Sequence, residues 1–153
     1  MLKAQPYLVF VLTFLLGFNA FAQQVQVDSL NQLLKTKYSE QGTARIKVLV
    51  ETSRLLLRID PQRSLGLSKE ALRLSITLGY NRLISHIYNN TGTANRLKGE
   101  FGKSLTFHNK ALENDRKIGD RKDEALSLNN IGNVFLKQGR YSEAISNLSL
   151  IHI

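Results

Sequence analysis

The stretch Asn89-Asn90-Thr91-Gly92 returns as Asn129-Asn130-Ile131-Gly132, with an offset of 40 residues between positions 92 and 132. The same offset relates Gly79 to Gly119, Gly99 to Gly139, and Ala71-Leu72 to Ala111-Leu112. A period of this length is typical of repeat units that stack into a solenoid, because each unit buries its apolar face against its neighbour. The period therefore predicts a repeat architecture.

Apolar residues between the repeated glycines follow helical spacing, as Leu30, Leu33 and Leu34 do near the N-terminus. We expect helices over residues 25–38, 43–58, 61–78, 81–98, 101–118 and 121–138, with a last one starting at 141. Asp60-Pro61 is a helix-start signal, and Asp120 with Asp123 and Glu124 places acid at another start. No run alternates with period two and no Asn-Gly hairpin signal occurs, so the pattern predicts an all-α fold.

Residues 1–22 have the pattern of a secretory signal peptide. Lys3 precedes the apolar run from Tyr7 to Phe18, and Ala20-Phe21-Ala22 places small residues at both positions that signal peptidase reads. We expect cleavage after Ala22, followed by a leading helix and linker over 23–42. The alternative is an uncleaved anchor, for which the run is short of the roughly 20 residues that span a bilayer. Export would place the chain in the periplasm or cell envelope of a Gram-negative bacterium.

The C-terminal residues 148–153 (LSLIHI) break the repeat phase. Ile151-His152 stands where earlier repeats have Ala-Leu, and a β-branched side chain would overpack a close helix contact. The stretch also resembles the translation of a transposon-end sequencing adapter. We therefore expect 148–153 to be a non-native tail on a fragment whose native sequence continues differently after Asn147. The alternative is a divergent terminal cap, and re-sequencing of the locus distinguishes the two.

The formal net charge of the 153-residue chain is +9, and no cysteine is present. The absence of cysteine excludes disulfides, thiol nucleophiles and Cys-based metal sites. The basic residues are spread along the chain, which favours a solvated exterior and leaves an acidic partner or membrane headgroups as alternatives. An exported protein does not meet chromosomal DNA, so no nucleic-acid partner is expected.

No catalytic constellation is present in the sequence. The histidines are His86, His108 and His152, whose spacing matches no metal motif, and no glycine-rich phosphate loop occurs. His108 is expected to have a structural role. We expect no metal, no cofactor and no enzymatic activity.

The repeat beginning at residue 125 carries Leu128, Ile131-Gly132, Phe135, Gly139, Tyr141 and Ala144, and the one before it carries Tyr88, Thr91-Gly92, Gly99, Phe101 and Ser104. These segments resemble tetratricopeptide repeats (TPRs). The resemblance implies repeats over 43–153: a degenerate one at about 45–84 with Asp60-Pro61 at its turn, then 85–124, then a truncated 125–153. It implies a right-handed superhelical stack of antiparallel helix pairs.

The resemblance also implies which residues pack the repeats. Gly92 and Gly132 would let the partner helix approach at Ser104 and Ala144, and Thr52 would face Ser64 in the degenerate repeat. The other packing residues implied are Tyr88, Phe101, Leu128, Phe135 and Tyr141. Asn95 stands at an aromatic position of the pattern and should weaken that repeat.

The 40-residue period, longer than the usual 34, resembles repeats in the exported sensor regions of Bacteroidota histidine kinases and transcriptional regulators. This resemblance implies an extracytoplasmic module that binds protein or peptide, as the sensory or scaffolding part of a membrane signal-transduction protein. The alternative is a free-standing periplasmic adaptor, with an enzyme as a distant third. Membrane contact would come only through a segment downstream of Asn147, and the last helix could self-associate.

In the family, the first helix of each repeat lines a concave groove. By position, the resemblance implies a groove lined by His86, Asn89, Thr93, Arg96, Leu126, Asn129, Asn133 and Leu136, with Ile46, Leu49 and Ser53 in the degenerate repeat. Asparagine amides suit a peptide backbone, and Arg96 suits a carboxylate. For Asn90 and Asn130 an alternative is open: they could hydrogen-bond neighbouring helices instead.

Overall fold

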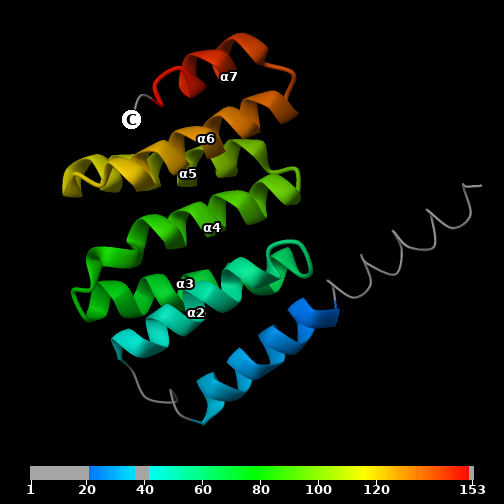
Figure 1. Cartoon of the computed structure of the whole chain (residues 1–153), viewed down its shortest axis with the longest axis vertical. Helices are drawn as coiled ribbons and strands as arrows, with labels where there is room; N and C mark the ends of the chain where they lie inside the picture. The colour runs from blue at the N-terminus through cyan, green and yellow to red at the C-terminus, as the bar shows by residue number, and fades with distance from the viewer. Residues whose placement is uncertain (1–20, 37–41, 152–153) are drawn as a thin grey trace, which may run out of the picture.

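The computed structural model of the chain describes residues 21–36 and 42–151, and within these it contains helices and no strand. A leading helix covers residues 21–35. The helices that follow are α2 (Thr43–Leu56), α3 (Pro61–Thr77), α4 (Ile84–Leu97), α5 (Phe101–Ile118), α6 (Arg121–Lys137) and α7 (Tyr141–Leu148), with the 3₁₀ helix η1 (Asn81–Leu83) before α4. Figure 1 shows them stacked as successive antiparallel pairs along the long axis.

The predicted all-α helical solenoid is confirmed. Consecutive helices pack against each other from α2 to α7, and α4 also contacts both α2 and α6. In each pair we name α2, α4 and α6 the first helices, and α3, α5 and α7 the second helices. Because each second helix returns the chain, the first helices all run in the same direction and end on the same side, at the right of Figure 1.

The helix ends follow local signals in the sequence. The Asp60 carboxylate accepts a hydrogen bond from the Arg63 amide at 2.9 Å, and Asp120 accepts one from the Asp123 amide at 3.1 Å. Each satisfies an amide that has no partner inside its own helix. Gly119 ends α5 in the left-handed region with φ 73°, where a side chain would be strained. The prediction for 81–98 differs at its start, where η1 replaces the first α-helical turn.

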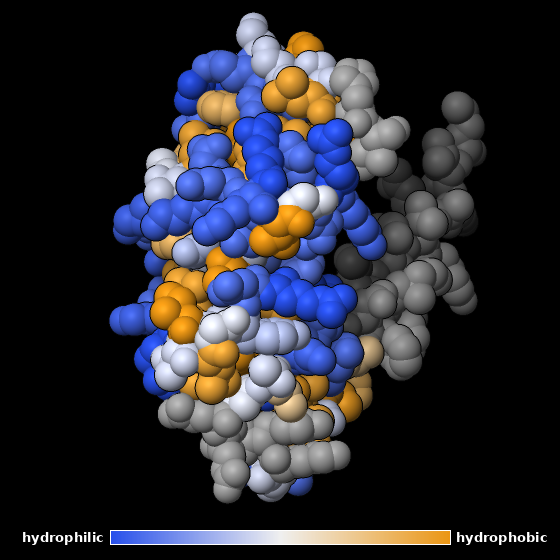
Figure 2. Space-filling view, turned by 90° about the vertical axis from the view of Figure 1, so that its left-hand side faces the viewer, coloured by the Kyte–Doolittle hydropathy of each residue, from blue (hydrophilic) through white to orange (hydrophobic). Residues whose placement is uncertain are grey.

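Apolar residues fill the space between the helix pairs. One cluster joins Leu34 of the leading helix to Ile46, Leu49, Ala71, Leu74 and Ile87, and another joins Leu112, Leu128 and Ile131. The small residues Ala71 and Ala111, which repeat with the 40-residue period, are both fully buried. Figure 2 shows the outside of one edge as mostly hydrophilic, with apolar residues in separate patches.

The repeat contacts correct two of the packing predictions. A Cβ on Gly92 would meet the His108 ring at 2.7 Å, and one on Gly132 would meet Leu148 at 2.9 Å, so the close approach lies one turn beyond the fully buried Ser104 and Ala144. In the first pair, Ser53 rather than Thr52 bonds Ser64, with 3.0 Å between the hydroxyl oxygens. The second helix thus contacts the first at shifted positions.

The residues predicted to pack the repeats differ in how deeply they are buried. Leu128 is buried, while Tyr88, Phe101 and Phe135 are half-buried. The Tyr88 ring lies 6.2 Å from that of Phe107 on α5. Tyr141 is also predicted to pack, but it is 65% exposed at the start of α7. Asn95 is buried and donates to the Thr91 carbonyl of its own helix at 2.8 Å.

The two ends of the chain are described only in part. The apolar run of the predicted signal peptide lies outside the described residues, and so do positions 37–38 of the predicted leading helix and His152. Helix α7 ends at Leu148, and Ile151 packs against the cluster that contains Leu128. Among the described residues, no helix is both long enough and apolar enough to cross a bilayer.

Candidate ligand-binding groove

The predicted groove residues on α6 are accessible. Leu126 and Leu136 are 42% and 43% exposed, Asn129 is exposed and Asn133 is half-buried. In the described part of the chain, neither amide forms a hydrogen bond to protein. One helix therefore carries two accessible apolar side chains and two asparagine side-chain amides whose hydrogen-bonding groups are available. This arrangement can bind both the side chains and the backbone of a peptide.

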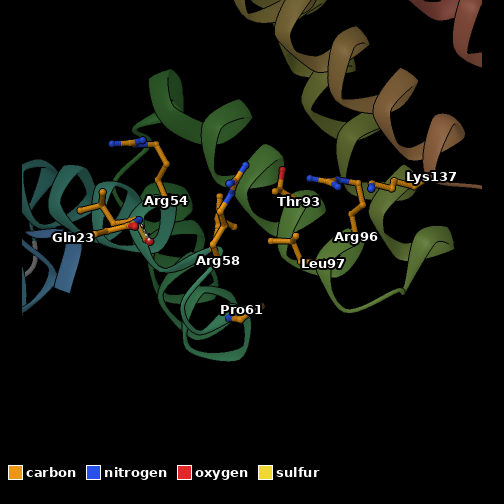
Figure 3. Close-up of a pocket in the computed structure, with 10 residues that line it drawn as sticks. Gln23, Arg54, Arg58, Pro61, Thr93, Arg96, Leu97 and Lys137 are labelled. Carbon is orange, nitrogen blue, oxygen red and sulfur yellow. Dashed lines mark hydrogen bonds between the residues drawn. The ribbon is translucent and has the colours of Figure 1, made fainter. Parts of the chain in front are cut away.

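Thr93 and Arg96 on α4 line a cavity of about 790 Å³ at the ends of the first helices. We call this cavity the basic groove, because its lining includes cations from all the first helices. Its residues are Gln23, Arg54, Leu55, Leu57, Arg58, Pro61, Thr93, Arg96, Leu97 and Lys137. Figure 3 shows Arg54, Arg58, Arg96 and Lys137 spread along it, with Gln23 at one end and Lys137 at the other.

His86 lies at the opposite end of α4 from Arg96. Its Nε2 lies 3.2 Å from the Asp123 Oδ2 of α6, so the imidazole links two first helices. His86 also lines a smaller cavity of about 310 Å³ with Lys47, Glu51 and Asn90. This second cavity contains both charge signs, unlike the basic groove.

Asn89 is not a groove residue, which corrects the prediction. It is only 6% exposed. Its Nδ2 donates to the Ser127 hydroxyl at 3.0 Å, and its Oδ1 lies 2.8 Å from His108 Nδ1. Both polar atoms of its side chain thus bond within the protein. Ile46, Leu49 and Ser53 are fully buried as well, so the predicted groove positions of the degenerate repeat also belong to the core.

Asn90 and Asn130 occupy equivalent positions and have equivalent roles. Asn90 Nδ2 donates to the Val50 carbonyl of α2 at 3.0 Å, and Asn130 Nδ2 donates to Asn89 Oδ1 of α4 at 3.2 Å. Each therefore joins its own first helix to the preceding one. This confirms the alternative in which the second asparagine of the repeated stretch holds neighbouring helices.

His108 is fully buried, and its Nε2 has no hydrogen-bond partner in the described structure. Burial, with a smaller contribution from the charge of Arg96, lowers the pKa of His108 to about 4. Burial also raises the pKa of Asp115, which accepts from Ser127 at 2.7 Å. These groups lie between α4, α5 and α6 and are not among the residues that line either cavity, so they contribute to packing. Among the described residues, no group of three or more His, Cys, Asp or Glu side chains could hold a metal ion.

The sequence model of the tetratricopeptide repeat family matches residues 83–149. Among curated proteins, the human G-protein-signaling modulator 1 is 29% identical over 107 residues, which are 70% of this chain and 16% of that protein. Among solved structures, the crystal structure of the TPR domain of Arabidopsis FLU matches with a TM-score of 0.63 and 15% identity, over 69% of this chain and 90% of that one. The chain thus has a TPR-like fold, which is typically a non-catalytic scaffold for protein interactions. It spans about 16% of the length of the curated relative.

Proposed function

We propose that the chain binds a protein or peptide along its first helices, outside the cytoplasm, as the sensory or scaffolding part of a membrane signal-transduction protein. The observation that carries the binding function is that the side-chain amides of Asn129 and Asn133, on the accessible face of α6, form no hydrogen bond within the described part of the chain. The TPR family match over 83–149 includes this helix. Export is supported by the sequence pattern of residues 1–22.

The chemistry of the α6 face suits an extended peptide. Each asparagine amide offers two donors and one acceptor, which can pair with the carbonyl and amide groups of a peptide backbone. Leu126 and Leu136 lie at the two ends of this face and can receive apolar side chains. Backbone pairing supplies affinity without demanding one peptide sequence, and the leucines add selectivity.

The binding test uses a peptide selected by phage display on the purified protein, with affinity measured by calorimetry. Asn129→Ala combined with Asn133→Ala should weaken binding more than about tenfold at an unchanged melting temperature. The matched control is Asn109→Ala, which removes an exposed amide from α5. Unchanged affinity in the double variant would contradict the assignment of Asn129 and Asn133 to the peptide-binding groove.

Location and context need separate measurements. A fusion to alkaline phosphatase, which is active only after export, should be active with residues 1–22 present and inactive when residues 7–18 are deleted. Full activity without the apolar run would refute export by a signal peptide. The DNA downstream of Asn147 distinguishes the sensor from a free-standing adaptor: about 20 apolar residues and then a kinase or DNA-binding domain indicate the sensor, whereas a stop after another repeat indicates the adaptor.

A further inference from the structure

Cations from successive first helices line one groove on the molecule. Arg54 and Arg58 reach the basic groove from the end of α2, Arg96 from α4 and Lys137 from α6. No acidic side chain is among the residues that line this groove. The groove is therefore a site of concentrated positive charge on a surface whose charges are otherwise spread.

Most of these cations lack a neutralising partner. Arg54 pairs with Glu51 at 2.5 Å in an exposed ion pair. For Arg58, Arg96 and Lys137, no carboxylate of the described chain lies within ion-pair distance. Like charges that face one another without counter-charges repel, and an anionic partner relieves that repulsion.

Helix stability explains part of this arrangement but not the whole. Arg54, Arg96 and Lys137 each stand in the last turn of a first helix, where a cation interacts favourably with the helix dipole. That effect accounts for one cation per helix. Arg58 lies beyond the end of α2 and gains less from it, yet its side chain also extends into the groove. Because the first helices run in the same direction, all these cations line the same groove.

The groove has a wall and an apolar lining. Gln23 of the leading helix donates from Nε2 to the Leu55 carbonyl at 2.7 Å, which ties that helix to the end of α2 and closes one end of the groove. Leu55, Leu97 and Pro61 add apolar surface between the cations. A recessed groove of this kind suits a segment that enters it, whereas a flat membrane surface is better matched by an exposed basic face.

We propose that the basic groove binds an acidic, extended polypeptide segment with apolar side chains between its carboxylates. The inference rests on the proposed peptide-binding function and names the class of partner. Arginine binds carboxylates through paired N–H donors, so Arg58 and Arg96 are the specific contacts, and Lys137 adds charge. With about 10 Å between neighbouring packed helices, the groove from α2 to α6 takes about six residues of extended chain at about 3.3 Å each.

The test measures fluorescence anisotropy of a labelled peptide of alternating Glu and Leu, beside an identical peptide with Gln in place of every Glu. The groove variant is Arg58→Gln with Arg96→Gln. The control is Lys69→Gln with Arg73→Gln, which removes the same charge from exposed positions of α3. We expect the Glu peptide to bind, the Gln peptide to bind at least about tenfold more weakly, and the groove variant to lose about tenfold or more while the control stays close to wild type.

Equal losses in the groove and control variants, or equal binding of the Glu and Gln peptides, would overturn the inference. Anionic phosphatidylglycerol vesicles are tested in parallel. Co-sedimentation that the groove variant abolishes, without any binding of the Glu peptide, would assign the groove to lipid and also overturn it. If a peptide binds in a way that depends on Asn129 and Asn133 but not on the arginines, the proposed function stands. Only the inference that the partner is an acidic segment is then refuted.

Discussion

His108 Nδ1 lies 2.8 Å from Asn89 Oδ1 inside the contact between α5 and α4. The orientation of these groups follows from their neighbours. Ser127 donates its hydroxyl hydrogen to Asp115 Oδ2 at 2.7 Å, so it must accept from Asn89 Nδ2 at 3.0 Å, which leaves Asn89 Oδ1 as the acceptor for His108. The neutral imidazole therefore carries its proton on Nδ1. A buried polar chain therefore joins α4, α5 and α6.

Gly92→Ala should destabilise the protein. A Cβ at this position would come within 2.7 Å of the imidazole of His108, which is fully buried and hydrogen-bonded to Asn89. Since a buried, hydrogen-bonded ring would have to shift, we expect the free energy of unfolding to fall by about 1–3 kcal/mol in urea denaturation. In a His108→Ser background the clash is gone, and the same substitution should be neutral or stabilising.

Gly66→Ala is the control for this prediction. Gly66 lies in α3, and a Cβ there meets nothing within 4 Å. Alanine should therefore stabilise the helix by about 0.5–1 kcal/mol. If Gly92→Ala and Gly66→Ala changed stability alike, the close contact between Gly92 and His108 would be refuted.

Stability should fall as the solution is acidified from pH 7. The pKa of His108 is lowered from 6.5 to about 4 in the folded protein, first by burial and then by the charge of Arg96. The unfolded chain binds this proton more readily, so the stabilisation is complete above about pH 6.5 and is lost as the pH falls to about 4. At 1.36 kcal/mol per pKa unit the loss is about 3 kcal/mol.

His108→Gln isolates this effect, because the variant keeps a donor in the ring's place and removes the titration. The wild-type protein should lose stability more steeply than the variant between pH 7 and about 4, by urea unfolding at each pH. The carboxylates titrate in both proteins and their contributions largely cancel in the comparison. Parallel pH profiles would contradict a buried neutral imidazole.

The helices could be predicted from the sequence because glycine, Asp-Pro and the apolar period are local signals. The burial of Asn89 could not, since Asn89 and Asn129 share one repeat position and differ only in what surrounds them. Asn89 meets His108 and Ser127, whereas the residue that follows His108 by one period is Leu148, which cannot hydrogen-bond. One signal of this burial is present in the sequence. His108 stands at a second-helix position that is expected to be buried, and a buried imidazole needs a polar hydrogen-bond partner.

The basic groove was missed for a related reason. Arg54, Arg96 and Lys137 do not share a repeat position, so the 40-residue period does not reveal them as a set. They come together because the first helices end on the same side of the stack. The signal in the sequence was a cation in the last turn of each first helix, which is also an ordinary feature of stable helices.

Asp115→Asn should stabilise the protein at pH 8. Burial raises the pKa of Asp115 above its ordinary 3.8, so the folded state favours the neutral carboxyl. Its contribution to stability is complete below about pH 3.8 and is lost as the pH rises through the folded pKa. Asparagine keeps an acceptor for Ser127 without the charge, and its gain over wild type should shrink on acidification. A gain that is independent of pH, or a loss at pH 8, would contradict this reading.

Arg45 attaches the leading helix to the first repeat, and Arg45→Met should weaken that attachment. The guanidinium donates to Glu70 Oε1 of α3 from Nε at 3.0 Å and Nη2 at 2.7 Å, and from Nη1 to the Leu34 carbonyl at 3.0 Å. These charge-assisted bonds are partly buried, so their loss should cost about 1.5–3 kcal/mol in urea unfolding. The control is Arg54→Met, whose exposed pair with Glu51 should contribute less than about 1 kcal/mol. Equal costs for the two variants would show that burial of the Arg45 network adds nothing to its strength.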